Sequence, residues 1–315
     1  MPALYRDPHI DQVGIWGDPT STLDWCEENY VVTKYVAEFW NTITNYFMVV
    51  PPLLTAIRFY KTGVDARFVM SFLSVVAIGI GSTLFHATLL YKMQLLDELP
   101  MIYCTYIILY CVLTCNDEPH KKTFYLKFFL TISCVIVTLI YLIVVNPLVF
   151  QWAYGLSVAV LIVATNYSAR KYNVPLKFSI LALICYGFGF ILWNIDNEFC
   201  IYVRYFRGLL PWPFNTVGQL HAWWHCFAAF GGYFQILFTI ELRMICRRRK
   251  HKWKMNGSHQ NGGTEIQQIG SDTILSFVIR DVCCCIPIKD QHLDAEYRTD
   301  NNNVFINGNY EVLKS

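Results

Sequence analysis

Three histidines lie within apolar stretches of this sequence, and two of them have a spacing that suits a metal ion. His221 and His225 bound the segment HAWWH, so a helix turns about 400° between them and both imidazoles leave one face. This arrangement fits a tetrahedral zinc ion. The alternative is that both rings are buried side chains that donate hydrogen bonds to backbone carbonyls. His86 lies in a different apolar stretch and becomes a third ligand only if the fold brings two helices together.

Two further polar residues lie close to His86 in the sequence. Ser82 precedes His86 by four residues and shares its helix face, and Asp97 follows after a short connection. A carboxylate beside a zinc-activated water takes its proton, and a hydroxyl stabilises a developing oxyanion. Simpler interpretations exist for each, since Asp97 could begin an interfacial helix and Ser82 could be a small residue between packed helices. Together with the histidines, they predict a metal-assisted hydrolase.

The composition indicates which kind of element must hold these residues. Hydrophobic residues make up 55% of the 315 residues and charged residues 15%, whereas a soluble domain has about 25% charged residues. The net charge of +2 provides no clustered basic surface for phosphate groups. We therefore exclude nucleic acid as a partner and expect a membrane protein.

Seven apolar stretches are each close to the length that crosses a bilayer, which is about 20 residues in a helix. They predict an all-α fold, a seven-transmembrane helix bundle. The third stretch is the shortest, and Pro100 falls in its first turn, where proline is tolerated. The stretches cover residues 39–57, 68–91, 99–115, 128–145, 147–169, 178–195 and 218–240.

Basic residues at the ends of these stretches predict the orientation of the bundle. They cluster after the first, third, fifth and seventh stretches, which places the N-terminus in the lumen and the C-terminus in the cytosol. Arg204 and Arg207 on the luminal side are the exception. Residues 1–36 lack the apolar segment of a cleavable signal peptide, so the first stretch is expected to act as its own insertion signal. The clusters contain Arg58, Lys61 and Arg67; Lys121, Lys122 and Lys127; Arg170, Lys171 and Lys177; and Arg247, Arg248, Arg249 and Lys250.

This orientation puts the three histidines at one depth. His86 lies five residues before the luminal end of the second stretch, and His221 and His225 lie three and seven residues into the last one. At about 1.5 Å per residue, all three fall within roughly 10 Å of the same bilayer face. Three histidines around one ion leave a fourth position for water, which is typical of a catalytic zinc site.

A second polar cluster precedes the first stretch. It contains Asp24, Glu27, Glu28 and Asn29, with Glu38 further along. Oxygen donors of this kind bind calcium, although the spacing is not that of an EF-hand. A helix that starts near Ser21 with an acidic first turn is an equally good interpretation. Cys26 and Cys200 both fall on the luminal side, where oxidising conditions allow a disulfide between them.

The sequence thus divides into a luminal segment over residues 1–36, a seven-span catalytic domain over 37–245 and a cytosolic tail over 246–315. From about Lys250 the composition turns to Asn, Gly, Gln and Asp, which predicts a mostly disordered tail. The tail contains the run Cys283–Cys285, a candidate for palmitoylation beside the membrane.

Six blocks of the sequence resemble the alkaline ceramidase family, and more specifically its phytoceramidase-type members. These proteins are seven-span membrane amidases that cleave ceramide into a sphingoid base and a fatty acid. The spacing between the blocks matches across residues 15–245, whereas the long tail departs from the family pattern. The blocks are STLDWCEENY (21–30), AEFWNT (37–42), GSTLFH (81–86), MQLLDELPMIY (93–103), ILWNIDNEFC (191–200) and QLHAWWH (219–225).

The resemblance implies catalytic zinc at His86, His221 and His225, with Asp97 handling the proton of the activated water and Ser82 assisting at the oxyanion. It also implies structural or regulatory calcium, held by Asp24, Glu27, Asn29, Glu38 and the carbonyl of Trp25. The implied partners are a ceramide-type substrate and membrane lipids, with no obligate protein partner, in the endoplasmic reticulum or Golgi membrane. The resemblance also implies an alkaline pH optimum for the activity.

Two rival functions remain open at this point. One is a related seven-span lipid hydrolase, such as an adiponectin-receptor-like protein acting on another bond. The other is a transporter or receptor in which the histidines relay protons or bind a ligand, although the paired broken helices of many transporters are missing from the pattern.

Overall fold

The structure is a computed structural model that describes residues 11–116 and 123–258, and it gives no side-chain positions for 251–258. Within these ranges every regular element is a helix, and the one β-bridge joins Thr33 to Val36 in a loop. The all-α class predicted from the sequence is confirmed. The elements are α1 (Phe39–Thr44), α2 (Tyr46–Lys61), α3 (Ala66–Thr88), α4 (Tyr91–Leu113), α5 (Phe124–Val144), α6 (Pro147–Tyr172), α7 (Lys177–Glu198), α8 (Cys200–Leu209), the 3₁₀ helix η1 (Phe214–Gly218) and α9 (Leu220–Ser258).

Five of the described helices, α3 to α7, are long and apolar enough to cross a membrane. The first predicted stretch corresponds to α1 and α2, which are separated only by Asn45 in a right-handed helical conformation. The last predicted stretch, 218–240, lies in α9 from Leu220 onward, with Gly218 closing the preceding 3₁₀ helix. All seven apolar stretches therefore fold as helices, and the chain is a membrane protein with at least five helices suited to a bilayer.

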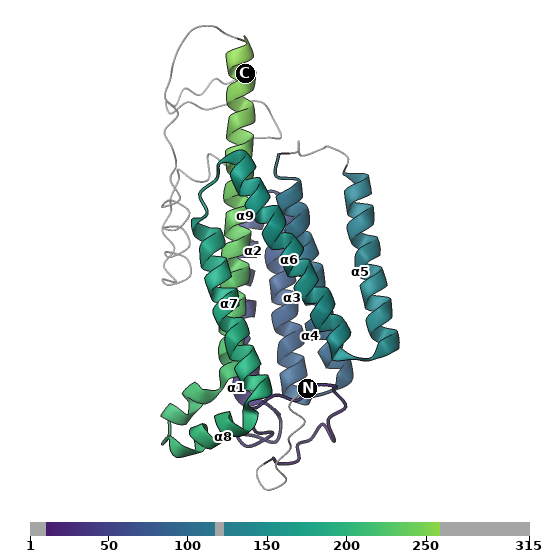
Figure 1. Cartoon of the computed structure of the whole chain (residues 1–315), viewed down its shortest axis with the longest axis vertical. Helices are drawn as coiled ribbons and strands as arrows, with labels where there is room; N and C mark the ends of the chain where they lie inside the picture. Colours follow the sequence, from purple (N-terminus) through teal and green to yellow (C-terminus); the bar gives the residue numbers. More distant parts are fainter. Residues whose placement is uncertain (1–10, 117–122, 259–315) are drawn as a thin grey trace.

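Helix α9 lies beside α7 in the bundle (Figure 1). Its most extensive contact is with α7, and it also contacts α1, α2, α3, α4 and α6. Its buried Tyr233 and Phe238 belong to the main apolar core, together with Phe72 of α3. The segment that carries two of the candidate ligands is therefore held on several sides.

Helices α3 and α4 approach each other closely at Gly81. A Cβ atom at this position would lie 1.9 Å from the carbonyl oxygen of Leu96. That carbonyl is four residues before Pro100, which has no N–H to offer it. Glycine and proline together thus allow the two backbones to meet next to Asp97.

The predicted start of the third span is wrong. Helix α4 begins at Tyr91 rather than at residue 99, so Pro100 lies inside the helix and not in its first turn. The helix continues through Asp97 and Glu98 because both acids have partners: Asp97 bonds to Ser82, and Glu98 accepts hydrogen bonds from Tyr141 and Gln94. Charge alone is a poor marker of a helix end when the charged groups are paired inside the fold.

The far end of the last helix also differs from the prediction. Helix α9 continues to Ser258, well beyond residue 240, because the arginines and lysines that follow are good helix formers. Residues 246–258 are therefore helical. The rest of the predicted tail, including Cys283–Cys285, lies outside the described residues.

Candidate metal centre

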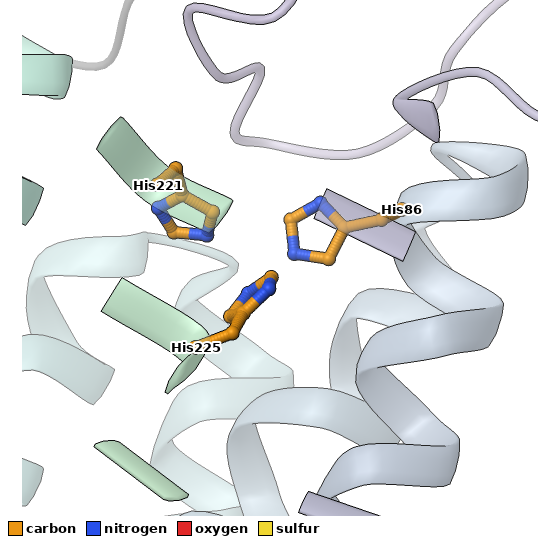
Figure 2. A group of neighbouring side chains, drawn as sticks. All are labelled: His86, His221 and His225. Carbon is orange, nitrogen blue, oxygen red and sulfur yellow. The ribbon is translucent and has the colours of Figure 1, made fainter. Parts of the chain in front are cut away.

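The structure brings His86, His221 and His225 together near one end of the bundle (Figure 2). His86 comes from α3 and the other two from the first turns of α9, and a nitrogen of each ring points into a shared space. One ligand nitrogen from each ring lies within 4.8 Å of the others, and the ring centroids are 4.7 to 5.1 Å apart. All three side chains are buried. Two helices far apart in the sequence thus present three imidazoles to one point.

Each of the three rings contacts a residue from the N-terminal part of the chain. A carboxylate oxygen of Glu38 contacts Nδ1 of His86, and the Thr44 hydroxyl lies 3.1 Å from Nδ1 of His225. The indole of Trp25 stacks on the ring of His221 with 3.8 Å between centroids. Carboxylate and hydroxyl partners of this kind fix the orientation of ligating histidines in metal sites.

Two of the buried ring nitrogens have no hydrogen-bond partner. These are Nε2 of His86 and Nδ1 of His221. A buried polar atom without a partner is costly, and a cation in the space between the rings would satisfy Nε2 of His86. Figure 2 shows that the other nitrogen of His221, rather than Nδ1, faces this space. The donor set of three nitrogens fits zinc, so the residues present suit the ion that the resemblance implies.

Asp196 of α7 fixes the start of α9. Its carboxylate accepts hydrogen bonds from the backbone N–H groups of His221, at 3.3 Å, and Cys26, at 3.1 Å. The first contact caps the helix N-terminus that carries the histidines. The sequence placed Asp196 in a family-like block but assigned it no role, and only its position in space shows one.

Ser82 and Asp97 meet across the α3–α4 contact. Their side chains are hydrogen-bonded, with Ser82 buried one turn before His86 and Asp97 partly exposed in the second turn of α4. Asp97 does not begin a helix, so that simpler interpretation is wrong. The pair combines a hydroxyl donor and a carboxylate acceptor on the face of α3 that carries His86.

The acidic residues of the N-terminal segment form a second buried cluster. Asp24, Glu27, Asn29 and Glu38 are all buried, and the carboxyl groups of Asp24 and Glu38 contact each other. No helix begins near Ser21, so the capping interpretation of this segment is wrong. Instead, Glu27 accepts hydrogen bonds from the backbone of Trp40 and Asn41 in α1, at 2.6 and 2.8 Å.

This cluster has the donor chemistry of a calcium site. Oδ1 of Asn29 is buried without a hydrogen-bond partner, and the Trp25 backbone, whose carbonyl was predicted to bind the ion, donates to Glu38 at 3.1 Å. Oxygen ligands of several kinds suit calcium. Among the described residues, only the three histidines converge within 4.8 Å as a group of metal-binding side chains. The calcium assignment therefore depends on its oxygen donors rather than on tightly gathered carboxylates.

Burial raises the pKa of both glutamates of this cluster. The pKa of Glu27 rises to about 8, chiefly through burial and then through the neighbouring Glu38. Burial likewise raises the pKa of Glu38 to about 8. Ionised forms of these groups need a compensating positive charge, which a bound cation would supply.

A disulfide and two arginines connect this segment to α8. Cys26 and Cys200 form a disulfide with their Cα atoms 5.2 Å apart. Arg204 and Arg207, the exceptions to the charge pattern, donate to the backbone carbonyl of Cys26 at 3.0 and 2.8 Å. Because both arginines are bonded to groups inside the protein, their positive charges do not indicate on which side of the membrane this segment lies.

Comparison with known proteins places the chain in a family. The Ceramidase family model matches residues 17–261. This chain belongs to the ceramidase family. It is 42% identical over 248 residues to alkaline ceramidase 3 of Mus musculus, which covers 78% of this chain and 93% of the mouse protein.

Similarity extends to more distant ceramidases. The chain is 33% identical over 258 residues to the alkaline ceramidase YPC1 of Saccharomyces cerevisiae, covering 76% of this chain and 81% of the yeast protein. It is 28% identical over 249 residues to an alkaline ceramidase of Arabidopsis thaliana, covering 76% and 88% of the two chains. The matched region contains both buried clusters and all of the described helices from α1 through α9.

Proposed function

We propose that this protein is a zinc-dependent amidohydrolase that cleaves the N-acyl amide of ceramides within the membrane, releasing a sphingoid base and a free fatty acid. The observation that carries the proposal is the convergence of His86, His221 and His225 in a chain of the ceramidase family. The orphaned Nε2 of His86 and the adjacent hydroxyl–carboxylate pair support it.

The proposed roles follow from the chemistry of the side chains. Zinc held by the three histidines would supply a Lewis acid that polarises the amide carbonyl and makes water more acidic. The Asp97 carboxylate accepts the proton of the attacking water and later returns it to the leaving amine nitrogen. The Ser82 hydroxyl orients Asp97 in the substrate-free protein and donates to the developing oxyanion during the reaction.

We propose a seven-span topology in which α1 and α2 form one span and α9 another. The N-terminus then lies in the lumen of the endoplasmic reticulum or Golgi and the C-terminus in the cytosol. The basic residues at the ends of α2 and α6 and in the second half of α9 support this orientation, as does the disulfide at the opposite end, because disulfides persist in oxidising compartments. An amide near the membrane interface is then at the depth of the histidines.

In the same proposal, Asp24, Trp25, Glu27, Asn29 and Glu38 bind calcium. Glu38 contacts both this cluster and His86, so the calcium site would stabilise the zinc site through one side chain. We assign calcium a structural or regulatory role, since none of its ligands lies among the three histidines.

Product analysis tests the activity directly. Purified protein is incubated with a fluorescent ceramide, with and without a zinc chelator, and the products are separated by chromatography. The proposal predicts a released sphingoid base, loss of the product with chelator and recovery on adding zinc. Cleavage of an ester lipid but not of ceramide would favour a sibling hydrolase, and no hydrolysis by the zinc-loaded protein would favour a transporter or receptor.

A further inference from the structure

Helix α8 is amphipathic, but its charged face is turned toward the protein and its apolar face is exposed. The exposed residues fall within an arc of about 140° of the helix. Each has between 62% and 64% of its surface accessible. They are Ile201, Tyr202, Tyr205, Phe206 and Leu209.

The opposite face carries the two arginines and the disulfide. Arg207 is buried and donates to the Cys26 carbonyl at 2.8 Å and to Glu28 at 2.7 Å. Arg204 donates to the Cys26 and Glu27 carbonyls at 3.0 and 3.3 Å. A helix surrounded by water would expose these charges and bury the aromatic residues, so the exposed face indicates apolar surroundings.

The place of α8 in the fold suggests what those surroundings are. It follows directly after α7, a helix suited to cross a membrane, and runs across the histidine end of the bundle rather than along it (Figure 1). Large apolar side chains are also exposed on either side of α8, namely Phe190 and Ile191 of α7 before it and Trp212 after it. Aromatic side chains of this kind are enriched at the boundary between lipid and water.

We propose that α8 lies in the plane of the membrane interface, with its apolar face in the lipid leaflet at the histidine end of the bundle. We assign lipid as the partner of this face, since α8 directly follows a helix suited to cross the membrane and both helices expose large apolar side chains. Because Cys26 is bonded to α8, the helix anchors the N-terminal segment that carries Trp25 over His221. The membrane would thereby hold in place the N-terminal segment that lies over the candidate metal centre.

Photocrosslinking of the full chain in phospholipid nanodiscs tests this placement. Benzoylphenylalanine at position 206 replaces one exposed aromatic residue with another and inserts into nearby C–H bonds on illumination. The same probe at Ile184 in α7 serves as the lipid-facing reference, and at Val13 in the exposed N-terminal segment as the solvent-facing one. Intact mass then reports a protein–phospholipid adduct or its absence.

The expected result is a phospholipid adduct at position 206 with a yield within about twofold of that at position 184, and none at position 13. A position-206 probe that forms no lipid adduct, or one that crosslinks mainly to a second copy of the chain, would overturn the proposal. The same probe at Tyr202 provides an independent position on the same face if the first variant is not monodisperse. None of these readouts depends on ceramide hydrolysis.

Discussion

Thr44 illustrates how a single hydroxyl can organise a metal ligand. Its Oγ1 donates to the Trp40 carbonyl at 2.9 Å, which leaves its lone pairs to accept from Nδ1–H of His225 at 3.1 Å. With the proton on Nδ1, the other ring nitrogen is free to bind a metal. Thr44 therefore selects the tautomer that ligation requires.

Replacing Thr44 by valine removes this partner with little change in volume. We expect a loss of zinc affinity of about 10- to 100-fold, measured by chelator competition, as for other partners of ligating histidines. Thr44→Ser should retain most of the affinity. Thr62→Val is the matched control, because Thr62 makes the same bond to a carbonyl four residues earlier but lies at the end of α2. Equal affinities of Thr44→Val and the control would rule out this role.

Asp97 carries the proposed proton transfer, and its amide variant separates chemistry from metal binding. We expect Asp97→Asn to lower kcat for ceramide by about 10²- to 10⁴-fold, the usual contribution of a general base. Its zinc content should match that of the unmodified protein, because the three histidines are intact. Asp18→Asn, at an exposed position, is the control and should leave kcat unchanged. A fully active Asp97→Asn would remove the residue from the mechanism.

At the scale of elements, the contact between α3 and α4 sets the position of Asp97 relative to Ser82. A methyl group at Gly81 would meet the Leu96 carbonyl at 1.9 Å, and the backbone of α4 would have to move. We expect Gly81→Ala to lower both thermal stability and kcat, with a loss of stability of about 1–3 kcal/mol from overpacking. Differential scanning calorimetry of the purified protein measures thermal stability, and the ceramide assay measures kcat.

Gly155→Ala is the matched control for this substitution. Gly155 also lies in a helix, and a Cβ atom there has no neighbour within 4 Å. Alanine should be neutral or stabilising by up to about 1 kcal/mol because it favours the helix more than glycine does. If the two variants behave alike, the close approach of α3 and α4 does not constrain the site.

The same elements show what the sequence could and could not predict. The uncharged stretches predicted helices, and counting residues from their ends put His86 level with His221 and His225, because helix rise is regular. The start of α4 and the existence of α8 were not predictable in this way. Paired Asp97 and Glu98 look like an interfacial boundary in sequence, and α8 lies in a stretch with two arginines that resembles a solvent-exposed loop.

Contacts between distant residues were the least predictable part of the site. Thr44 and Asp196 act on His225 and His221 across 181 and 25 residues, respectively. Neither residue belongs to a spacing pattern that identifies it. Their roles depend on how α1 and α7 pack against α9, which no local pattern in the sequence encodes.

For the molecule as a whole, we expect the buried acidic cluster to make stability depend on calcium and on pH. The pKa of Glu27 and of Glu38 rises from 4.5 to about 8 in the metal-free fold. A carboxyl group whose pKa is raised in the folded state contributes fully to stability below its unfolded-state pKa of 4.5. This contribution is lost as the pH rises through the folded-state pKa of about 8. Calcium would bind the ionised carboxylates, so its stabilising effect is expected to grow over the same pH range.

We therefore expect calcium chelation to lower Tm more at pH 8.5 than at pH 6. A ligand at 100 times its Kd stabilises by about 2.7 kcal/mol, or roughly 5–10 °C for a protein of this size class. Glu27→Gln should abolish the calcium-dependent part of the Tm shift. A chelator effect that is equal at both pH values, or that persists in Glu27→Gln, would contradict the assignment.

The central claim is that three histidines from α3 and α9 hold one catalytic zinc ion, and metal analysis of purified protein tests it most directly. We predict about one zinc per chain in the unmodified protein and in Asp97→Asn, because a three-histidine site binds a single ion. His86→Ala, His221→Ala and His225→Ala, each purified as a monodisperse protein, should retain little zinc and should not hydrolyse ceramide. A full equivalent of zinc in any one of these histidine variants, together with normal ceramide hydrolysis, would contradict the account.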